Sequence, residues 1–153
     1  MYYLIVILTT VILPIASIAI EYSARPDADP IFLLGKWFVF WGVGVRLLLA
    51  GLSQATRPSF TASGILGIND PTAEKVVAEL GYANIAMGLI GVLSPFSPGW
   101  TVPAGLAGGL FLGLAGFKHM ANTNRNTKEN VAMATDLFVF AVVANYLVSL
   151  IVR

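Results

Sequence analysis

The chain has 153 residues, of which 57% are hydrophobic and only 11% are charged, and its mean hydropathy is +0.80. This composition leaves too little polar surface for a water-soluble domain. The absence of cysteine excludes disulfides, thiolate ligands and cysteine nucleophiles. A net charge of +1 offers no basic surplus for phosphate backbones, so nucleic acid is not an expected partner. We therefore expect a membrane protein whose main surrounding is the lipid bilayer.

Five apolar segments are each long enough to cross a hydrocarbon core of roughly 30 Å, which takes about 20 helical residues. They lie at about residues 2–22, 32–54, 72–95, 102–121 and 130–152. The first segment lacks the basic start and small-residue cleavage site of a secretory signal, so we expect it to be retained. The predicted fold class is all-α, with residues 1–153 forming a single transmembrane domain of five helices.

The connections between these segments are short, apart from residues 55–69. This stretch mixes apolar residues with glycines, which favours a short interfacial or re-entrant piece over another crossing. After it, Asp70 and Pro71 predict the start of the third helix, with Asp70 as its N-cap.

Basic residues outside the membrane centre predict the orientation of the chain in the membrane. Five lie on the side of the N-terminus, namely Arg57, Lys75, Lys118, Arg125 and Lys128, and three on the other, namely Arg25, Lys36 and Arg153. Because basic residues concentrate on the inner side, we expect a multi-pass protein of the cytoplasmic membrane with its N-terminus inside.

Small residues recur at helical spacing in the third and fourth segments. One stripe consists of Gly81, Asn84, Gly88 and Gly91, and the other of Gly105, Gly109, Gly113 and Gly116. Such faces let helix backbones approach closely, so both stripes predict tight packing against neighbouring helices. An alternative hypothesis is that the glycines leave room for a ligand or a moving helix.

Ionisable residues inside the apolar segments are the most informative feature, because they are costly in hydrocarbon. Counting from the helix ends at about 1.5 Å per residue places four of them in one layer on the N-terminal side. These four are Arg46, Glu79, Lys118 and Asp136, whose formal charges sum to zero. We expect Arg46 and Glu79 to form a structural ion pair, with a functional site as the alternative.

A second ion pair is expected near the opposite interface, between Glu21 and Lys36. His119 is the only histidine and lies at the end of the fourth segment. There it fits a capping or interfacial role, with a proton relay to Asp136 or Glu79 as the alternative. No metal site is expected, since the chain has neither a cysteine nor a second histidine to complete one.

No Walker loop, His-Glu-x-x-His or Gly-x-Ser-x-Gly motif is present, and no nucleophile constellation is visible, so no catalytic residues are predicted and an enzyme is not favoured. The strings Arg46–Leu52 (RLLLAGL), Gly35–Trp41 (GKWFVFW) and Glu79–Asn84 (ELGYAN), with the glycine-rich segment ending at His119, resemble the DoxX-like families. These are small prokaryotic membrane proteins with a four-helix core, and the chain looks most like an uncharacterised relative of them. The resemblance covers about residues 32–150, which makes the first helix an addition to that core.

DoxX itself is associated with a membrane quinone-linked oxidoreductase, so the resemblance implies quinone as a possible cofactor and no transferable catalytic residue. Three functions stay open. The first is an accessory or self-associating subunit of a membrane complex, with other membrane subunits or further copies as partners. The second is a binder of a quinone-like or other amphipathic molecule in an intramembrane polar pocket lined by Arg46, Glu79, His119 and Asp136. The third, an ion or solute pathway, is disfavoured because the charged layer is confined to one half of the bilayer.

Overall fold

A computed structural model describes residues 1–97 and 99–152, and every regular element in these ranges is helical. Five stretches are long and apolar enough to span a membrane, namely Tyr2–Ala24, Pro30–Thr56, Pro71–Phe96, Thr101–Ala121 and Thr127–Val152. The predicted all-α bundle of five transmembrane helices is therefore confirmed, and the chain is a multi-pass membrane protein.

The first two spans are each interrupted in the middle by a wider π-helical segment. The first span consists of α1 (Tyr2–Ile7), η1 (Leu8–Ile12) and α2 (Leu13–Ala24), and the second of α3 (Pro30–Trp37), η2 (Phe38–Val45) and α4 (Arg46–Thr56). The short α5 (Pro58–Ala62) follows, and the remaining elements are α6 (Pro71–Leu93), η3 (Ser94–Phe96), α7 (Thr101–Ala121) and α8 (Thr127–Val152).

Local sequence explains where several of these elements begin. Asp70 accepts a hydrogen bond from the backbone N–H of Thr72 at 2.8 Å and Pro71 fills the first helical position, which confirms the predicted start of α6. Pro14 is the second residue of α2, two residues after η1 ends at Ile12. Because a proline ring clashes with the carbonyl one turn earlier, the wider π turn provides the room that this residue requires.

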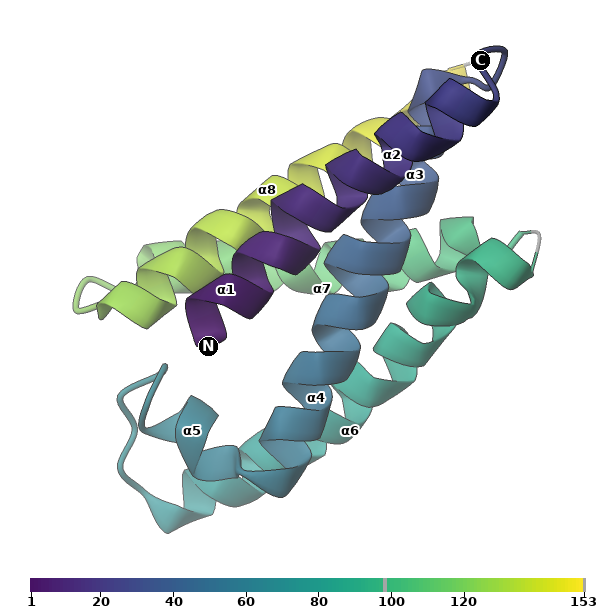
Figure 1. Ribbon diagram of the computed structural model, residues 1–153. Coiled ribbons are helices and arrows are strands. Elements are labelled where there is room, and N and C mark those ends of the chain that lie inside the picture. The colour runs from purple at the N-terminus through teal and green to yellow at the C-terminus, as the bar shows by residue number, and fades with distance from the viewer. Residues whose placement is uncertain (98, 153) are drawn as a thin grey trace.

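The second span is the centre of the bundle. Its α3 contacts α2 and α8, its η2 contacts α6, α7 and α8, and its α4 runs along α6. The first span packs on the second, through contacts of α2 with α3 and of η1 with η2. Figure 1 shows α4 and α6 running together as an arm that diverges from α8 toward α5. The chain termini lie on opposite sides, as an odd number of crossings requires.

The buried core is formed by the second, fourth and fifth spans. It contains Phe38, Val39, Val43 and Leu47 from the second span, Ala104 and Leu112 from α7, and Val139 and Val143 from α8. The first span adds only Ile18 at the edge of this cluster. The third span likewise adds only the partly buried Met87, so the first and third spans pack around a core that the other three share.

The two glycine stripes do not pack against each other: the α6 stripe contacts the second span, and the α7 stripe contacts both the second span and α8. A Cβ added at Gly88 would meet the backbone N of Leu48 at 2.5 Å, and one at Gly91 would meet the Cα of Gly44 at 2.6 Å. In contrast, a Cβ at Gly105 would meet side-chain methyls of Val39 and Val143, at 3.1 and 3.2 Å. The backbone of α6 thus contacts the backbone of the second span. The glycines of α7 instead contact side chains of the second span and of α8.

Candidate functional site

The charged layer on the N-terminal side centres on an ion pair between the second and fifth spans. Arg46, the first residue of α4, lies with Nη2 2.5 Å from Oδ1 of Asp136 on α8. The same Nη2 donates a 2.9 Å hydrogen bond to Oγ1 of Thr135. The side chains of Arg46 and Asp136 are only 11% and 8% exposed, so the two charges neutralise each other inside the bundle.

The expected pair between Arg46 and Glu79 is not formed. Glu79 is exposed on α6 and makes no ion pair with any described residue. The reason lies in the glycine face of this helix: Gly81 packs on α4, and Glu79, two residues earlier, points about 160° away from it. Equal depth in the membrane was predicted from residue counts, but helix rotation decided which acid meets Arg46.

His119 forms a second polar contact at the same end of the bundle. Its Nδ1 lies 2.9 Å from Oε1 of Glu129, which also accepts a 2.9 Å hydrogen bond from the side-chain amide of Asn122. Glu129 is only 3% exposed. His119 therefore links the end of α7 to the start of α8, and its contact is neither Asp136 nor Glu79.

Further contacts fix the loops around this site. Arg125 donates from Nη1 to the carbonyl oxygens of His119 and Met120, both at 3.0 Å, and so caps the C-terminus of α7. The side-chain amide of Asn126 donates to the carbonyl of Ile65 at 2.7 Å. The turn between α7 and α8 is thereby tied to the segment after α5.

A pocket of about 440 Å³ opens between these segments. Its lining combines apolar and polar side chains, namely Leu66, Ile68, Lys118, His119, Ala121, Asn122 and Glu129. Of the four residues that the sequence predicted for a ligand pocket, only His119 is among them. Arg46 and Asp136 are engaged with each other, and Glu79 faces outward.

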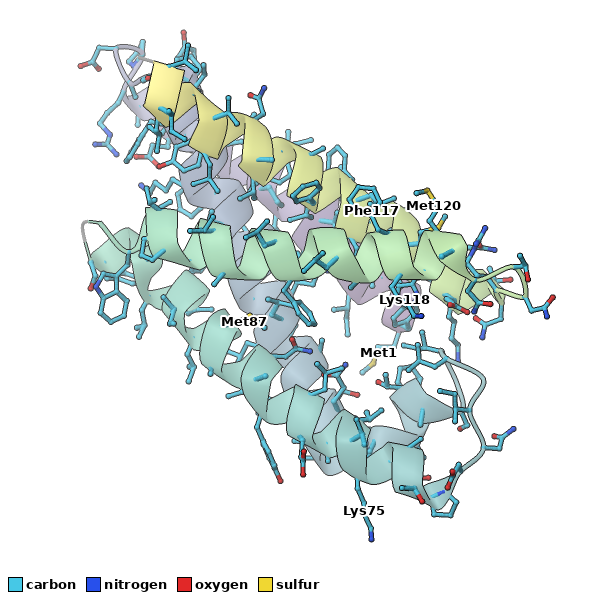
Figure 2. All side chains as sticks on the ribbon, turned by 180° about the vertical axis from the view of Figure 1, so that it is seen from behind. Met1, Lys75, Met87, Phe117, Lys118 and Met120 are labelled. Carbon is cyan, nitrogen blue, oxygen red and sulfur yellow. The ribbon has the colours of Figure 1, made fainter. Side chains whose placement is uncertain are left out.

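Lys118 provides the exposed cation of this pocket. It has no ion pair with any residue that the structure describes, although it belongs to the predicted charged layer. Figure 2 shows its side chain pointing from α7 toward Met1, whereas Lys75 on α6 points away from the bundle. The ammonium of Lys118 is therefore available to bind a ligand. Lys75 is also exposed but lies outside the pocket, so it can serve as a control.

The second expected ion pair lies at the other end of the bundle. Nζ of Lys36 is 2.7 Å from Oε2 of Glu21, and the indole N–H of Trp37 donates to the same oxygen at 2.8 Å. Arg25 also pairs with Glu21. These contacts join the first span to the second, and Glu21, Lys36 and Arg25 all have charged partners within this end of the bundle.

Sequence reasoning missed Glu129 as a partner of His119. The positions of the two residues in the sequence could have indicated this contact. His119 lies two residues before the end of α7, and Glu129 is the third residue of α8. Two consecutive antiparallel helices place such residues at the same level. Among the described residues, no group of three or more histidine or acidic side chains could hold a metal ion.

A separate groove of about 300 Å³ runs between α7 and α8 and is lined by apolar side chains and by Gly105 and Gly109. It offers no polar side chain, so it fits an acyl chain of the surrounding lipid better than a ligand that needs orientation.

Residues 1–152 match a family described as a family of unknown function (DUF6790). Searches of curated proteins and of solved structures found no match. The matched description does not refer to DoxX-like proteins, so that resemblance stays a prediction. Because the match covers almost the whole sequence, the chain belongs to the family of unknown function DUF6790.

Proposed function

We propose that this protein binds a small amphipathic molecule in the pocket at the N-terminal side of the bundle. The supporting observation is that the pocket joins the unpaired ammonium of Lys118 to an apolar wall at Leu66 and Ile68. Ligand pockets of this kind combine mostly apolar lining with a few polar groups that orient the ligand. The polar head would lie at Lys118 and the apolar part along Leu66 and Ile68.

The charges of the pocket favour a head group that accepts hydrogen bonds. Lys118 offers only donors. Glu129 already accepts hydrogen bonds from Asn122 and faces His119, so it is less available to a ligand. A carbonyl or carboxylate head suits this arrangement, and a quinone, with two carbonyls and an apolar tail, belongs to this class. The resemblance to DoxX-like proteins, which is itself a prediction, also implies a quinone.

An ion or solute pathway receives less support from the packing. Between the Arg46–Asp136 pair and the Glu21–Lys36 pair lie Val39, Val43, Val139 and Val143, each 0% exposed. A layer of fully buried valines offers no polar groups to replace the hydration of an ion.

We also propose that the protein lies in the cytoplasmic membrane with its N-terminus inside. The contacts gather the first residues, the 57–70 connection and the 122–126 turn on one side, since Tyr2 donates to the carbonyl of Lys128 at 3.2 Å and Asn126 to that of Ile65 at 2.7 Å. This side carries the larger number of basic residues.

The binding proposal is tested by titrating decylubiquinone, and separately oleate, into the full chain in nanodiscs. We expect saturable binding of at least one probe, weakened about tenfold by Lys118→Ala, because a hydrogen bond to a charged group contributes about 1.5 kcal/mol. The matched control Lys75→Ala should leave the affinity unchanged. Equal affinity for both variants, or binding that never saturates with either probe, would remove the proposal.

A further inference from the structure

The outer face of α6 carries two opposite charges without partners. Lys75 and Glu79 are both exposed and lie one helical turn apart, yet neither forms an ion pair with the other or with any other described residue. Glu79 is eight residues beyond Pro71, about 12 Å along the helix. The α6 span is long enough to place this carboxylate inside the hydrocarbon boundary, where an exposed charge is costly.

Around Glu79 the same face presents two alanines between larger apolar side chains, Val76 and Ile90. Gly81 packs against α4, and at about 100° per residue Glu79, Ala83, Ala86 and Ile90 all lie within about 40° of the opposite direction. All four are exposed, so no described element of the chain covers this face. Two alanines at its centre permit another helix to approach closely.

We propose that this face of α6 packs against the α6 of a second copy of the chain. In a two-fold pair of parallel helices, residue i of one copy meets residue j of the other, and j meets i. Lys75 of each copy would pair with Glu79 of the other, with Ala83 and Ala86 near the crossing point.

Charge complementarity favours a second copy of the chain as the partner that covers this face of α6. The face carries one acid and one base at adjacent turns, so two identical faces neutralise all four charges without any group from another protein. A helix of a different protein would have to supply both a base for Glu79 and an acid for Lys75. Lipid tails supply neither.

The absence of cysteine in the chain makes disulfide cross-linking in native membranes a direct test. Single substitutions Ala83→Cys and Ala86→Cys should each give an oxidant-dependent product of twice the monomer mass, because residues near a two-fold axis come within disulfide range. The control is Leu110→Cys on α7, which is 49% exposed but far from this face, and it should stay monomeric. A cross-linked product of any other mass, or equal dimer from Leu110→Cys, would overturn the proposal.

A charge exchange supplies the second test in the Ala83→Cys background. Glu79→Lys places four positive charges at the interface and should reduce the dimer at least fivefold, whereas adding Lys75→Glu should restore it. Size-exclusion chromatography in detergent shows whether each variant is folded. A folded Glu79→Lys variant that cross-links like the parent, or a folded double variant that does not regain the dimer, would contradict the pairing.

Discussion

Arg46 on α4 and Asp136 on α8 lie 2.5 Å apart and join the second span to the fifth within the membrane-spanning bundle. Both side chains are about nine-tenths buried, so each charge has the other in place of water. A buried pair of this kind contributes little net stability compared with apolar residues, but the loss of one partner leaves an uncompensated charge. The pair therefore fixes the rotation of α8 against the central span.

This arrangement predicts an asymmetry between single and double substitutions. Arg46→Leu alone or Asp136→Leu alone should each lower the free energy of unfolding by about 3 kcal/mol or more, because one buried charge is left without a partner. The double substitution should cost clearly less than the sum of the two. Unfolding in mixed detergent and dodecyl sulfate, followed by tryptophan fluorescence, measures all three.

The control for these single and double substitutions is Glu79→Leu, which removes a carboxylate that contacts neither Arg46 nor Asp136. In detergent-solubilised monomer its effect should stay within about 0.5 kcal/mol, as for other exposed positions. Additive effects of the Arg46 and Asp136 substitutions, or a Glu79 effect as large as theirs, would contradict the assigned pairing.

The glycine faces predict that the same substitution has different effects on α6 and α7. Gly88→Ala should cost about 2 kcal/mol or more, because its Cβ would lie 2.5 Å from the backbone of Leu48, which cannot move alone. Gly105→Ala meets only methyl groups at 3.1 Å and beyond. Helix propensity gains about 1 kcal/mol at both sites, so Gly105→Ala should be near neutral. Similar unfolding midpoints for the two variants would count against this packing.

Arg125 is expected to hold the end of α7 next to the pocket. Arg125→Ala removes its hydrogen bonds to the carbonyls of His119 and Met120 and should cost about 1 kcal/mol locally. Hydrogen exchange by mass spectrometry should then be faster in residues 119–124. Arg57→Ala, an exposed arginine without a side-chain contact in the described structure, should leave that peptide unchanged.

The proposed orientation is checked by cysteine accessibility in intact cells. A cysteine at Asn124→Cys, in the turn between α7 and α8, should react with a membrane-impermeant maleimide only after the cells are opened. A cysteine at Asp27→Cys, in the first connection, should react from outside. The reverse pattern would place the N-terminus on the outer side.

The sequence was sufficient to predict the five spans, because apolar length alone determines which segments cross a bilayer. It also predicted the Glu21–Lys36 contact, since these residues flank one short connection and have few alternative partners. The depth of Arg46 and Asp136 followed from counting residues to the helix ends.

The number of residues to the helix ends predicts depth in the membrane, but it predicts neither the rotation of a helix about its axis nor which helices are neighbours. Arg46 had two acids at similar depth, and only the packing of Gly81 on α4 turns Glu79 away and leaves Asp136. The pocket was missed for a related reason. It depends on the segment at Leu66 and Ile68 folding back under α7, and no periodic pattern in residues 55–69 specifies that position.

Site mapping with a photoreactive amphiphile tests the central claim most directly. The full chain in nanodiscs is illuminated with a quinone analogue that carries a diazirine near its head, and labelled peptides are identified by mass spectrometry. We predict labels in residues 66–68 and 118–122, lost on competition with unlabelled probe and reduced by Lys118→Ala but not by Lys75→Ala. Labels confined to the apolar groove between α7 and α8, or spread evenly over the lipid-facing surface, would contradict the account.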